Sequence, residues 1–472
     1  MLTFRTPYFK VSVISAGVSN QSNQFNLSTF QPFNYLPLFI ALLFVSHPIQ
    51  TQAVTYIIQR FTSLATFFYL LSLVSYIKFR ISVSGASRFT LYAVSLLSSV
   101  LAMKTKEIAF TLPVVIALYE FMFLEGKIRS RILYLIPLLL TMLIIPLSLI
   151  GIDKPIGDVI GELGEASQET AEITRWTYLF TQFRVIITYI RLLFLPINQN
   201  FDYDYSIYHS FLTPDVLLSF LFLLLIFGFG VYLFYVSRFT LYALRLASFG
   251  IFWFFITLSV ESSVIPIRDV IFEHRLYLPS IGGILVFASI IFWSLRVHSY
   301  NSRIPTAIYL MSVFLVISLS SAAYQRNTVW KDEISLWSDV ARKSPEKARP
   351  HHNLGVVYAL KGWSSEAMQE YKIALSLKSR FFSTAEIAKT HNNIGVLYSK
   401  QGQFEEAVME YKIALELLPN FEEAHYNLAV AYLSKEDIDS ARKEFEATLR
   451  INPLNSEAPK FLNYIEKRFS PH

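Results

Sequence analysis

The chain contains no cysteine and few charged residues, and each scarcity removes whole classes of protein. Without cysteine there is no disulfide, no thiolate metal site and no cysteine nucleophile. Charged residues make up only 16% of the 472 residues, whereas 53% are hydrophobic and 16% are aromatic. A soluble chain of this length carries more charge and less apolar surface. The composition therefore predicts a protein that exposes much of its surface to lipid.

Acidic residues are absent from the first part of the sequence, where Glu107 is the first carboxylate. The usual carboxylate general base is therefore excluded from residues 1–106. The net charge of +6 does not arise from a basic soluble domain, because many Lys and Arg residues lie in short loops between apolar runs. Such loops indicate membrane topology, and we expect no nucleic-acid partner.

Ten apolar stretches precede Arg326, after which the chain becomes polar. A bilayer core of about 30 Å is crossed by roughly 20 apolar residues, so most of these stretches can span it. The first ends early, at His47 and Pro48, and either joins its neighbour or forms part of a broken helix. No cleavable targeting segment is expected in the polar first thirty-odd residues. The stretches are residues 35–46, 61–77, 88–103, 107–123, 132–151, 176–194, 215–236, 241–259, 277–295 and 304–322.

Loop charges orient the spans, because Lys and Arg are retained on the cytoplasmic side. The loop 152–175 and the stretch after Pro196 are acidic and are expected outside. Helix 176–194 lies between them, so we expect it to dip into the membrane without crossing. Nine spans plus this helix place the C-terminal tail on the non-cytoplasmic side. The basic residues expected inside are Arg5, Lys10, Lys78, Arg80, Arg88, Lys127, Arg129, Arg131, Arg238, Arg296 and Arg303.

The polar tail carries a helical repeat. Leu354, Gly355 and Tyr358 recur 40 residues later with Ile in place of Leu, and after a further 34 residues with Ala in place of Gly. Thirty-four residues is the period of the tetratricopeptide repeat (TPR), and the six extra residues indicate an insertion around residues 379–386. Gly362 and Gly402 suit the turn inside each helix pair. The expected fold class is all-α, with a polytopic transmembrane domain followed by a TPR α-solenoid.

These patterns divide the chain into seven segments. They are a polar N-terminal segment (1–33), a membrane domain (34–325), a connecting helix (326–347), TPR 1 with its insertion (348–387), TPR 2 (388–421), TPR 3 (422–455) and a C-terminal helix (456–472).

Asn353, Asn393 and Asn427 occupy the same register in the three repeats. An amide both donates and accepts hydrogen bonds, so such a row can hold an extended peptide backbone in the groove of the solenoid. Alternatively, the three amides bond neighbouring helices. The partner expected here is a protein or a peptide.

Three polar clusters lie at or near membrane depth, where charge is costly and usually functional. The first runs from His47 to Arg60, the second contains Lys104, Lys106 and Glu107, and the third runs from Glu261 to Tyr277. All three are expected on the outer face. Their bases can bind a lipid phosphate, with Arg as a bidentate fork and Lys as a point charge. The alternative is interfacial anchoring with internal pairs, such as Glu273 with Arg275 or Arg268 with Asp269.

Around these clusters the sequence resembles the transmembrane and TPR-containing O-mannosyltransferase-like proteins, of the GT-C glycosyltransferase superfamily. The strings HPIQTQAVTYIIQR, MKTKEIAFTLP, ESSVIPIRDVIFEHRLYLPS and NTVWKDEISLW carry the resemblance. It implies transfer of a sugar from a polyprenyl-phosphate donor to a protein acceptor. The implied lipid-phosphate contacts are Lys104 and Lys106, followed by Arg60, His274 and Arg275.

One departure from the family concerns the catalytic residue. The resemblance implies a carboxylate in the first outward loop, and no such residue precedes Glu107. Either the true N-terminus lies upstream of Met1, or the protein is a non-catalytic relative. We assign no catalytic residue; Glu107, Glu261 or Asp269 serve only if the chemistry has moved. No cofactor is expected beyond the polyprenyl-phosphate-linked sugar, no metal site is assigned, and a need for a divalent metal stays open.

Two other functions remain to be separated from the transferase. A membrane-anchored TPR scaffold would bind peptides independently of Lys104 and Lys106. A transporter of lipid-linked sugars would need ionisable residues deep within the spans, for which Glu120 and Arg184 are the main candidates.

Overall fold

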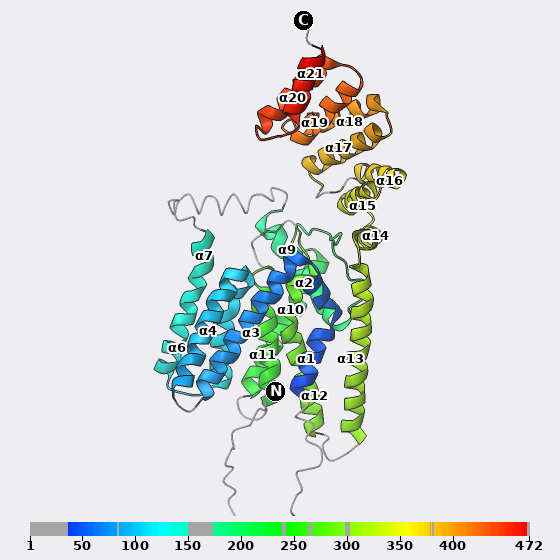
Figure 1. Ribbon diagram of the computed structural model, residues 1–472. Coiled ribbons are helices and arrows are strands. Elements are labelled where there is room, and N and C mark those ends of the chain that lie inside the picture. Colours follow the sequence, from blue (N-terminus) through cyan, green and yellow to red (C-terminus); the bar gives the residue numbers. More distant parts are fainter. Residues whose placement is uncertain are drawn as a thin grey trace, which may run out of the picture.

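The computed structural model describes residues 36–82, 85–149, 173–237, 242–262, 266–267, 269–297, 303–377, 379 and 382–469. In those ranges all the regular structure is helical, which confirms the all-α class (Figure 1). The polar segment 1–33, most of the acidic loop 152–175, and Arg238 and Arg268 lie outside the described residues.

The membrane domain is a helical bundle, with several short 3₁₀ turns at one end. Its α-helices are α1 (Leu36–Ser46), α2 (Thr51–Thr55), α3 (Arg60–Ile81), α4 (Ala86–Thr105), α5 (Leu112–Phe123), α6 (Ile128–Leu140), α7 (Ile144–Leu149), α9 (Arg175–Phe194), α10 (Pro214–Ser237), α11 (Tyr242–Leu258), α12 (Ser280–Val297) and α13 (Arg303–Val329). The 3₁₀ turns are η2 (Pro48–Gln50), η3 (Ile57–Gln59), η4 (Glu107–Thr111), η5 (Thr141–Leu143) and η6 (Glu273–Leu276).

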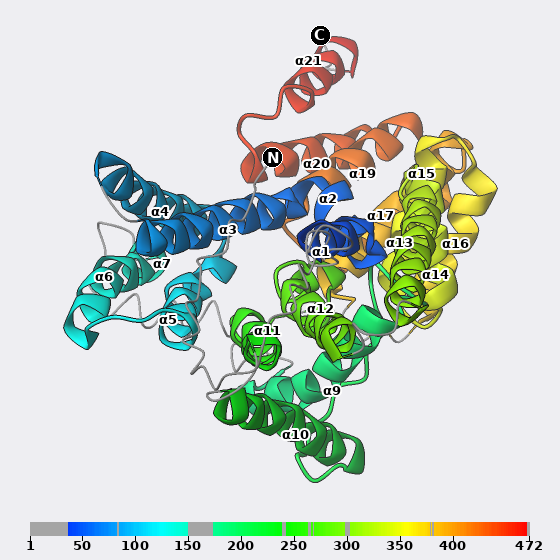
Figure 2. The ribbon, with the colours of Figure 1, turned by 90° about the horizontal axis from the view of Figure 1, so that it is seen from below.

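The bundle helices fall into groups that Figure 2 separates, with α3 to α7 on one side and α9 to α12 on another. The first group packs on the buried side chains of Tyr69, Tyr76 and Leu138, and α11 joins it through Trp253. Helix α13 lies beside α1 and leads directly into the polar tail. It continues to Val329, so it passes without a break through the boundary expected near Arg326.

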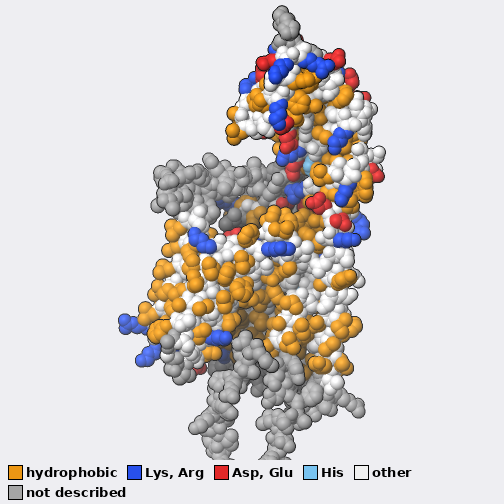
Figure 3. Space-filling model, in the orientation of Figure 1, with side chains coloured by type: hydrophobic (Ala, Val, Ile, Leu, Met, Phe, Trp, Pro, Cys, Tyr) orange, Lys and Arg blue, Asp and Glu red, His pale blue; other side chains and the backbone are white. Residues whose placement is uncertain are grey.

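Among the described residues, four stretches are long and apolar enough to cross a membrane: Ile57–Ile81, Ile128–Ser148, Pro214–Ser237 and Thr306–Val329. Leu36–Ser46 and Pro48–Thr55 form a further pair that bends by 54°, as a broken span or a re-entrant loop. Apolar side chains cover the flank of the bundle in Figure 3. The helices α11 and α12 are shorter and α9 is less apolar, so the count of nine spans stays a prediction.

Helices α11 and α12 approach closely where two glycines face each other. A Cβ atom added to Gly250 would lie 2.6 Å from the backbone oxygen of Gly282. Small residues permit such backbone contact between helices, and no larger side chain fits without a shift. This contact holds α12, and with it the turn η6 that precedes it, against the rest of the bundle.

The solenoid consists of three helix pairs and a final helix. The pairs are α15 (Ala348–Leu360) with α16 (Ser364–Ser376), α17 (Thr384–Lys400) with α18 (Phe404–Leu417), and α19 (Glu422–Ser434) with α20 (Ile438–Ile451), followed by α21 (Ala458–Phe469). Gly362 and Gly402 adopt positive φ in the first two turns, while Glu436 does so in the third. Gly355 and Gly395 lie against the rings of Tyr371 and Tyr411, which explains the small residue at that position of the repeat.

The insertion in the first repeat is divided between a loop and a longer helix. Helix α17 begins at Thr384, four residues before Ala388, which matches Ala348 at the start of α15. Ser383 and Glu386 form a capping box at its first turn. The connecting segment is α14 (Glu333–Lys343), which begins three residues beyond Trp330 and packs on α15.

Candidate functional site

The three polar clusters of the membrane domain meet at the end of the bundle that faces the solenoid. Gln52 accepts a hydrogen bond of 2.8 Å from the backbone N–H of His274. Gln50 donates to Ser280 at 3.0 Å, and Lys106 forms an ion pair with Glu261 at 3.3 Å. Contacts between residues more than 150 positions apart therefore join the clusters. We call Lys106, Glu261, His274 and Arg275 the outer cluster.

Lys106 is held in the outer cluster by the break between α4 and η4. Its backbone is extended, which ends α4 and turns the side chain towards α3. Its Nζ donates to Thr62 at 2.9 Å and to Gln59 at 3.4 Å. The side chains of Lys106 and Glu261 are only 12% and 8% exposed. A lysine so shielded from water is a stronger electrostatic partner for a phosphate than a surface lysine.

Lys104 and Arg60, which the resemblance also implies as phosphate contacts, both have exposed side chains. Lys104 lies on the last turn of α4 and joins no ion pair within the described ranges. Arg60 donates from Nε to the backbone oxygen of Val54 at 3.1 Å, inside its own segment. The structure therefore brings Lys106 into the cluster and leaves these two at the surface.

The turn η6 places three charged or polar side chains side by side in the interior. Glu273, His274 and Arg275 are all buried, and Arg275 donates to the backbone oxygens of Val270 and Asp269, each at 3.0 Å. Its guanidinium also lies 5.3 Å from the centre of the Phe272 ring. Arg275 therefore shapes the loop before η6 while its charge remains near Glu261.

His274 is held neutral. Burial lowers its pKa, and the nearby charges of Lys106 and Arg275 lower it further. Its Nδ1 is buried and has no hydrogen-bond partner among the described residues. A neutral imidazole with a free nitrogen can donate or accept one hydrogen bond to a ligand in the outer cluster.

Glu273 does not pair with Arg275, as one alternative predicted, but binds the stretch that follows α9. It accepts hydrogen bonds from Gln199 at 3.0 Å, from the backbone of Asn200 at 2.7 Å and from Tyr203 at 2.7 Å. Arg326 of α13 lies 3.9 Å away and pairs with Asp339 of α14 at 3.1 Å. A carboxylate with no exposed surface is therefore satisfied by four partners, and Arg326 connects it to α14.

The solenoid is docked on the same region by a second set of ion pairs. Lys347 pairs with Asp202, and its Nζ also lies 3.9 Å from Asp269. Arg349, on α15, lies 3.4 Å from Asp202 and 3.1 Å from Asp269. We call Lys347, Arg349, Asp202 and Asp269 the junction. Asp269 belongs to the loop that Arg275 holds, so the junction and the outer cluster share one loop.

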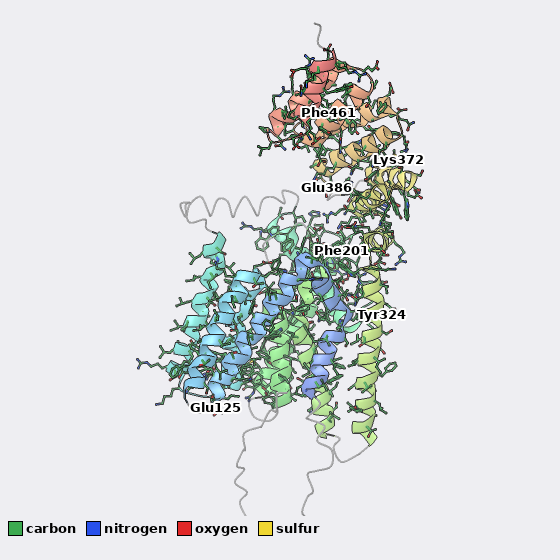
Figure 4. All side chains as sticks on the ribbon, in the orientation of Figure 1. Glu125, Phe201, Tyr324, Lys372, Glu386 and Phe461 are labelled. Carbon is green, nitrogen blue, oxygen red and sulfur yellow. The ribbon has the colours of Figure 1, made fainter. Side chains whose placement is uncertain are left out.

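Aromatic side chains complete the contact between the two domains. The ring of Phe201 lies between those of Tyr56, Trp330 and Trp337, with centroid distances of 5.2, 5.3 and 5.5 Å. Figure 4 labels Phe201 at the top of the bundle, directly below the first repeat. Side-chain packing therefore supports the ion pairs of the junction.

The three asparagines of the repeats are not equivalent. Asn427 donates to Asn392 of the preceding repeat at 3.0 Å, and Asn393 hydrogen-bonds the hydroxyl of Tyr371. Asn353 is half-buried on α15. The amides of Asn393 and Asn427 thus bond neighbouring helices, as the alternative interpretation predicted. Peptide binding by all three asparagines stays a prediction.

A row of imidazole–carboxylate pairs was not recognised from the sequence. His351 meets Glu370 at 2.7 Å, and His391 with Glu410 and His425 with Glu444 repeat this contact at 2.6 Å. The sequence does contain the pattern, because the histidine and the glutamate both recur at the offsets of 40 and 34 residues that reveal the repeat. Each pair links the two helices of one repeat.

The remaining candidates have structural partners. Glu120 is bound by Arg80, Arg131 and Tyr76, and Arg184 donates to Ser219 at 3.3 Å. Glu107 is exposed. Across the described ranges, no three His, Asp or Glu side chains gather in a way that would hold a metal ion.

Known proteins resemble this chain both in its tetratricopeptide repeats and over most of its length. Two models of the tetratricopeptide repeat match residues 395–436 and 422–455. The chain is 30% identical over 342 residues to the protein O-mannosyl-transferase F38B6.6 of Caenorhabditis elegans. That match covers 71% of this chain but only 45% of the nematode protein, so the chain spans less than half of its relative. The resemblance to TPR-containing O-mannosyltransferase-like proteins is confirmed.

Solved TPR structures match a minor part of the chain. The first TPR of Spaghetti (RPAP3) is 21% identical and covers 26% of this chain and 92% of its own, with a TM-score of 0.24. YrrB is 18% identical and covers 37% of this chain and 91% of its own, with a TM-score of 0.25.

Proposed function

We propose that this O-mannosyltransferase-like chain binds a polyprenyl-phosphate-linked sugar at its outer cluster and a protein acceptor in the groove of its solenoid. The curated relative is named as an O-mannosyl-transferase, which supports the reaction class. This chain covers less than half of that relative, so the activity is inferred from the site that is present.

The observation that carries the proposal is the meeting of Lys106, His274 and Arg275 at one end of the bundle. The buried Arg275 and the largely shielded Lys106, whose side chain is 12% exposed, share Glu261 as their nearby carboxylate among the described residues, which leaves a positive charge there. A lipid phosphate would compensate that charge. In this arrangement Lys106 supplies the point charge, and His274 supplies one further hydrogen bond through Nδ1.

The acceptor half of the proposal rests on the junction. Arg349 and Lys347 fix the first repeat directly against the loop that precedes η6. TPR solenoids present an extended concave surface to protein ligands. A segment held in that groove would be presented close to the outer cluster, which raises its effective concentration there.

Charge distribution supports a non-cytoplasmic tail. Lys78 and Arg80 lie in the last turn of α3, and Lys127, Arg129 and Arg131 lie at the start of α6, close in sequence to Glu125, which Figure 4 labels at the end of the bundle opposite the solenoid. If those residues are retained inside, the outer cluster and the repeats face the exterior, the periplasm or a lumen. Since the chain lacks native cysteine, single-cysteine labelling tests this directly. Lys127→Cys and Glu457→Cys should react from opposite sides, and reaction from the same side would contradict the topology.

Donor binding is the decisive experiment. The full chain in nanodiscs is titrated with a labelled polyprenyl-phosphate mannose, and Lys106→Met is compared with Lys104→Met. The proposal expects at least about tenfold weaker binding for Lys106→Met, since a charge-assisted hydrogen bond contributes roughly 1.5–3 kcal/mol. Lys104→Met should bind normally, because that side chain is exposed. Equal binding by both variants would remove the outer cluster as the donor site.

A membrane-anchored scaffold is the second candidate. The tetratricopeptide repeats of the tail support it, because such repeats present a surface to protein ligands. A scaffold would bind peptides with unchanged affinity in Lys106→Met and would neither bind nor consume the lipid-linked sugar. Transfer of labelled mannose to a peptide, in membranes that contain this chain as their only transferase, would exclude it.

A further inference from the structure

An arginine cluster lies at the end of the bundle farthest from the solenoid, near Glu125, which Figure 4 labels. Its centre is Glu120, a carboxylate with no exposed surface. Arg80 binds both oxygens of Glu120, at 2.7 and 2.9 Å, and Arg131 binds one of them at 3.1 Å. Tyr76 donates to the other oxygen at 3.0 Å. Both carboxylate oxygens of Glu120 therefore have hydrogen-bond partners, and two guanidinium groups share its single negative charge.

A third guanidinium, that of Arg88, joins this group and forms no ion pair with a carboxylate of the described residues. It lies 4.9 Å from the ring centre of Phe79 and 6.0 Å from that of Tyr134. Arg80 lies 5.4 Å from the same Tyr134 ring, so one aromatic side chain contacts both cations. The Nε of Arg88 is buried and has no hydrogen-bond partner in the described part of the chain.

Basic residues also outnumber acidic residues on the segments around the arginine cluster. Lys78, Lys127 and Arg129 lie at the ends of α3 and α6 or in the loop between α5 and α6, whereas Glu125 is the further carboxylate on these described segments. A guanidinium group shielded from water without a counter-charge is costly. An anion would supply the missing negative charge, and the planar guanidinium of Arg88, whose Nε has no partner among the described residues, matches a phosphate group.

The surroundings indicate that the anion belongs to a lipid. Ile128, Ile132 and Leu133 of α6 are 59%, 47% and 56% exposed, and Phe89, next to Arg88, is 77% exposed. Apolar side chains directly beside a cationic group fit a molecule that carries a charged head and acyl chains. The acyl chains of such a molecule would pack on these side chains, which a soluble anion does not do.

We propose that Arg80, Arg88 and Arg131 form a binding site for the phosphodiester head of an anionic phospholipid in the leaflet opposite the solenoid. Arg88 is the specific contact, because it is the one of the three that has no protein carboxylate among its described partners. Loop basicity that only sets topology would need no such arrangement, since it depends on the number of positive charges near the span and not on their geometry.

The test is lipid binding by the full chain in neutral detergent, followed by native mass spectrometry with phosphatidylglycerol or phosphatidylcholine. The wild type should bind phosphatidylglycerol more tightly than phosphatidylcholine by roughly fivefold or more, the increment expected for one basic side chain at an anionic surface. Arg88→Gln should abolish that preference. Arg129→Gln, which removes an exposed charge from the first turn of α6, should retain it.

Three results would overturn the assignment. They are equal affinity for the two lipids in the wild type, equal loss in Arg88→Gln and Arg129→Gln, and displacement of phosphatidylglycerol by millimolar inorganic phosphate, which would show that the site takes a free anion. If Arg88→Gln does not fold, Arg88→Lys keeps the charge but lacks the fork. It should then bind phosphatidylglycerol more weakly than the wild type, and unchanged binding would also overturn the proposal. Polyprenyl-phosphate binding at the outer cluster is measured independently, so the two proposals fail separately.

Discussion

Removal of the Lys347 charge should release the solenoid from the membrane domain. The side chains of Lys347 and Asp202 are 6% and 4% exposed, and Lys347 also donates to the backbone oxygen of Tyr203 at 3.0 Å. Loss of one partner from a buried ion pair costs about 3–5 kcal/mol, because the remaining charge stays buried. Arg349 remains 3.4 Å from Asp202 in Lys347→Met, so we expect about 3 kcal/mol, the lower end of that range.

Hydrogen exchange measures this cost at the junction itself. The backbone N–H of Ser344 donates to Val340 at 2.8 Å, and that of residue 347 donates to Ser344 at 3.1 Å. A change of about 3 kcal/mol in local opening raises the exchange rates of these amides by roughly a hundredfold, provided that exchange follows the opening equilibrium. Amides in the buried centre of α3 should not change, which separates undocking from global unfolding.

Lys435→Met is the matched control. Lys435 pairs with Glu405 at 3.1 Å, but the two side chains are 31% and 70% exposed. Exposed pairs contribute at most about 1 kcal/mol, so exchange near the junction should stay at its wild-type rate. The combined variant Asp202→Asn with Lys347→Met should recover part of the lost protection, because no buried charge is left without its partner. Equal exchange at Ser344 in Lys347→Met and Lys435→Met would refute the reasoning.

Three further outcomes are expected. Gly250→Ala should destabilise the bundle by roughly 1–3 kcal/mol, since the new methyl group would lie 2.6 Å from the backbone oxygen of Gly282. The melting temperature in detergent measures this effect. Gly228→Ala is the control and should not lower that temperature, because its methyl group would meet no atom within 4 Å. The hydrogen bond to Glu444 raises the pKa of His425, so the stabilisation from this pair is complete below the unfolded-state pKa of about 6.5 and is lost as the pH rises through the higher folded-state pKa. The stability difference between wild type and His425→Gln should therefore shrink from pH 6 to pH 8, and a difference that grows would contradict this sign. Gly395→Ala should lower the melting temperature of the solenoid, because its methyl group would meet the Tyr411 ring at 2.6 Å.

Local patterns in the sequence were sufficient for the helical class and for the repeats. The offsets of 40 and 34 residues follow from packing that each repeat shares with the next, so the helix pairs are visible without the fold. The break at Pro48 was also visible in the sequence, because proline lacks the backbone N–H that a residue inside a helix donates. The same logic would have revealed the pairing of His351 with Glu370, had the offsets been applied to polar positions.

The composition of the candidate site was only partly visible. The sequence identified the stretches that contain Lys106, His274 and Arg275, because charged residues beside apolar spans are conspicuous. It did not separate Lys106 from Lys104, two positions away, because that choice depends on where α4 ends and which way the next residue turns. It also paired Glu273 with Arg275, whereas the fold supplies partners from the stretch after α9 and from α13.

The sequence by itself determined that this chain is an apolar helical bundle joined to a repeat solenoid, since hydropathy and repeat spacing act over a few turns of helix. Only the tertiary structure decided which charges neutralise one another. Asp202 and Lys347 are 145 residues apart, and Lys106 and Glu261 belong to different helix ends. Electrostatic pairing depends on distance in space and on exclusion of water, and neither quantity is encoded in the spacing of residues along the chain.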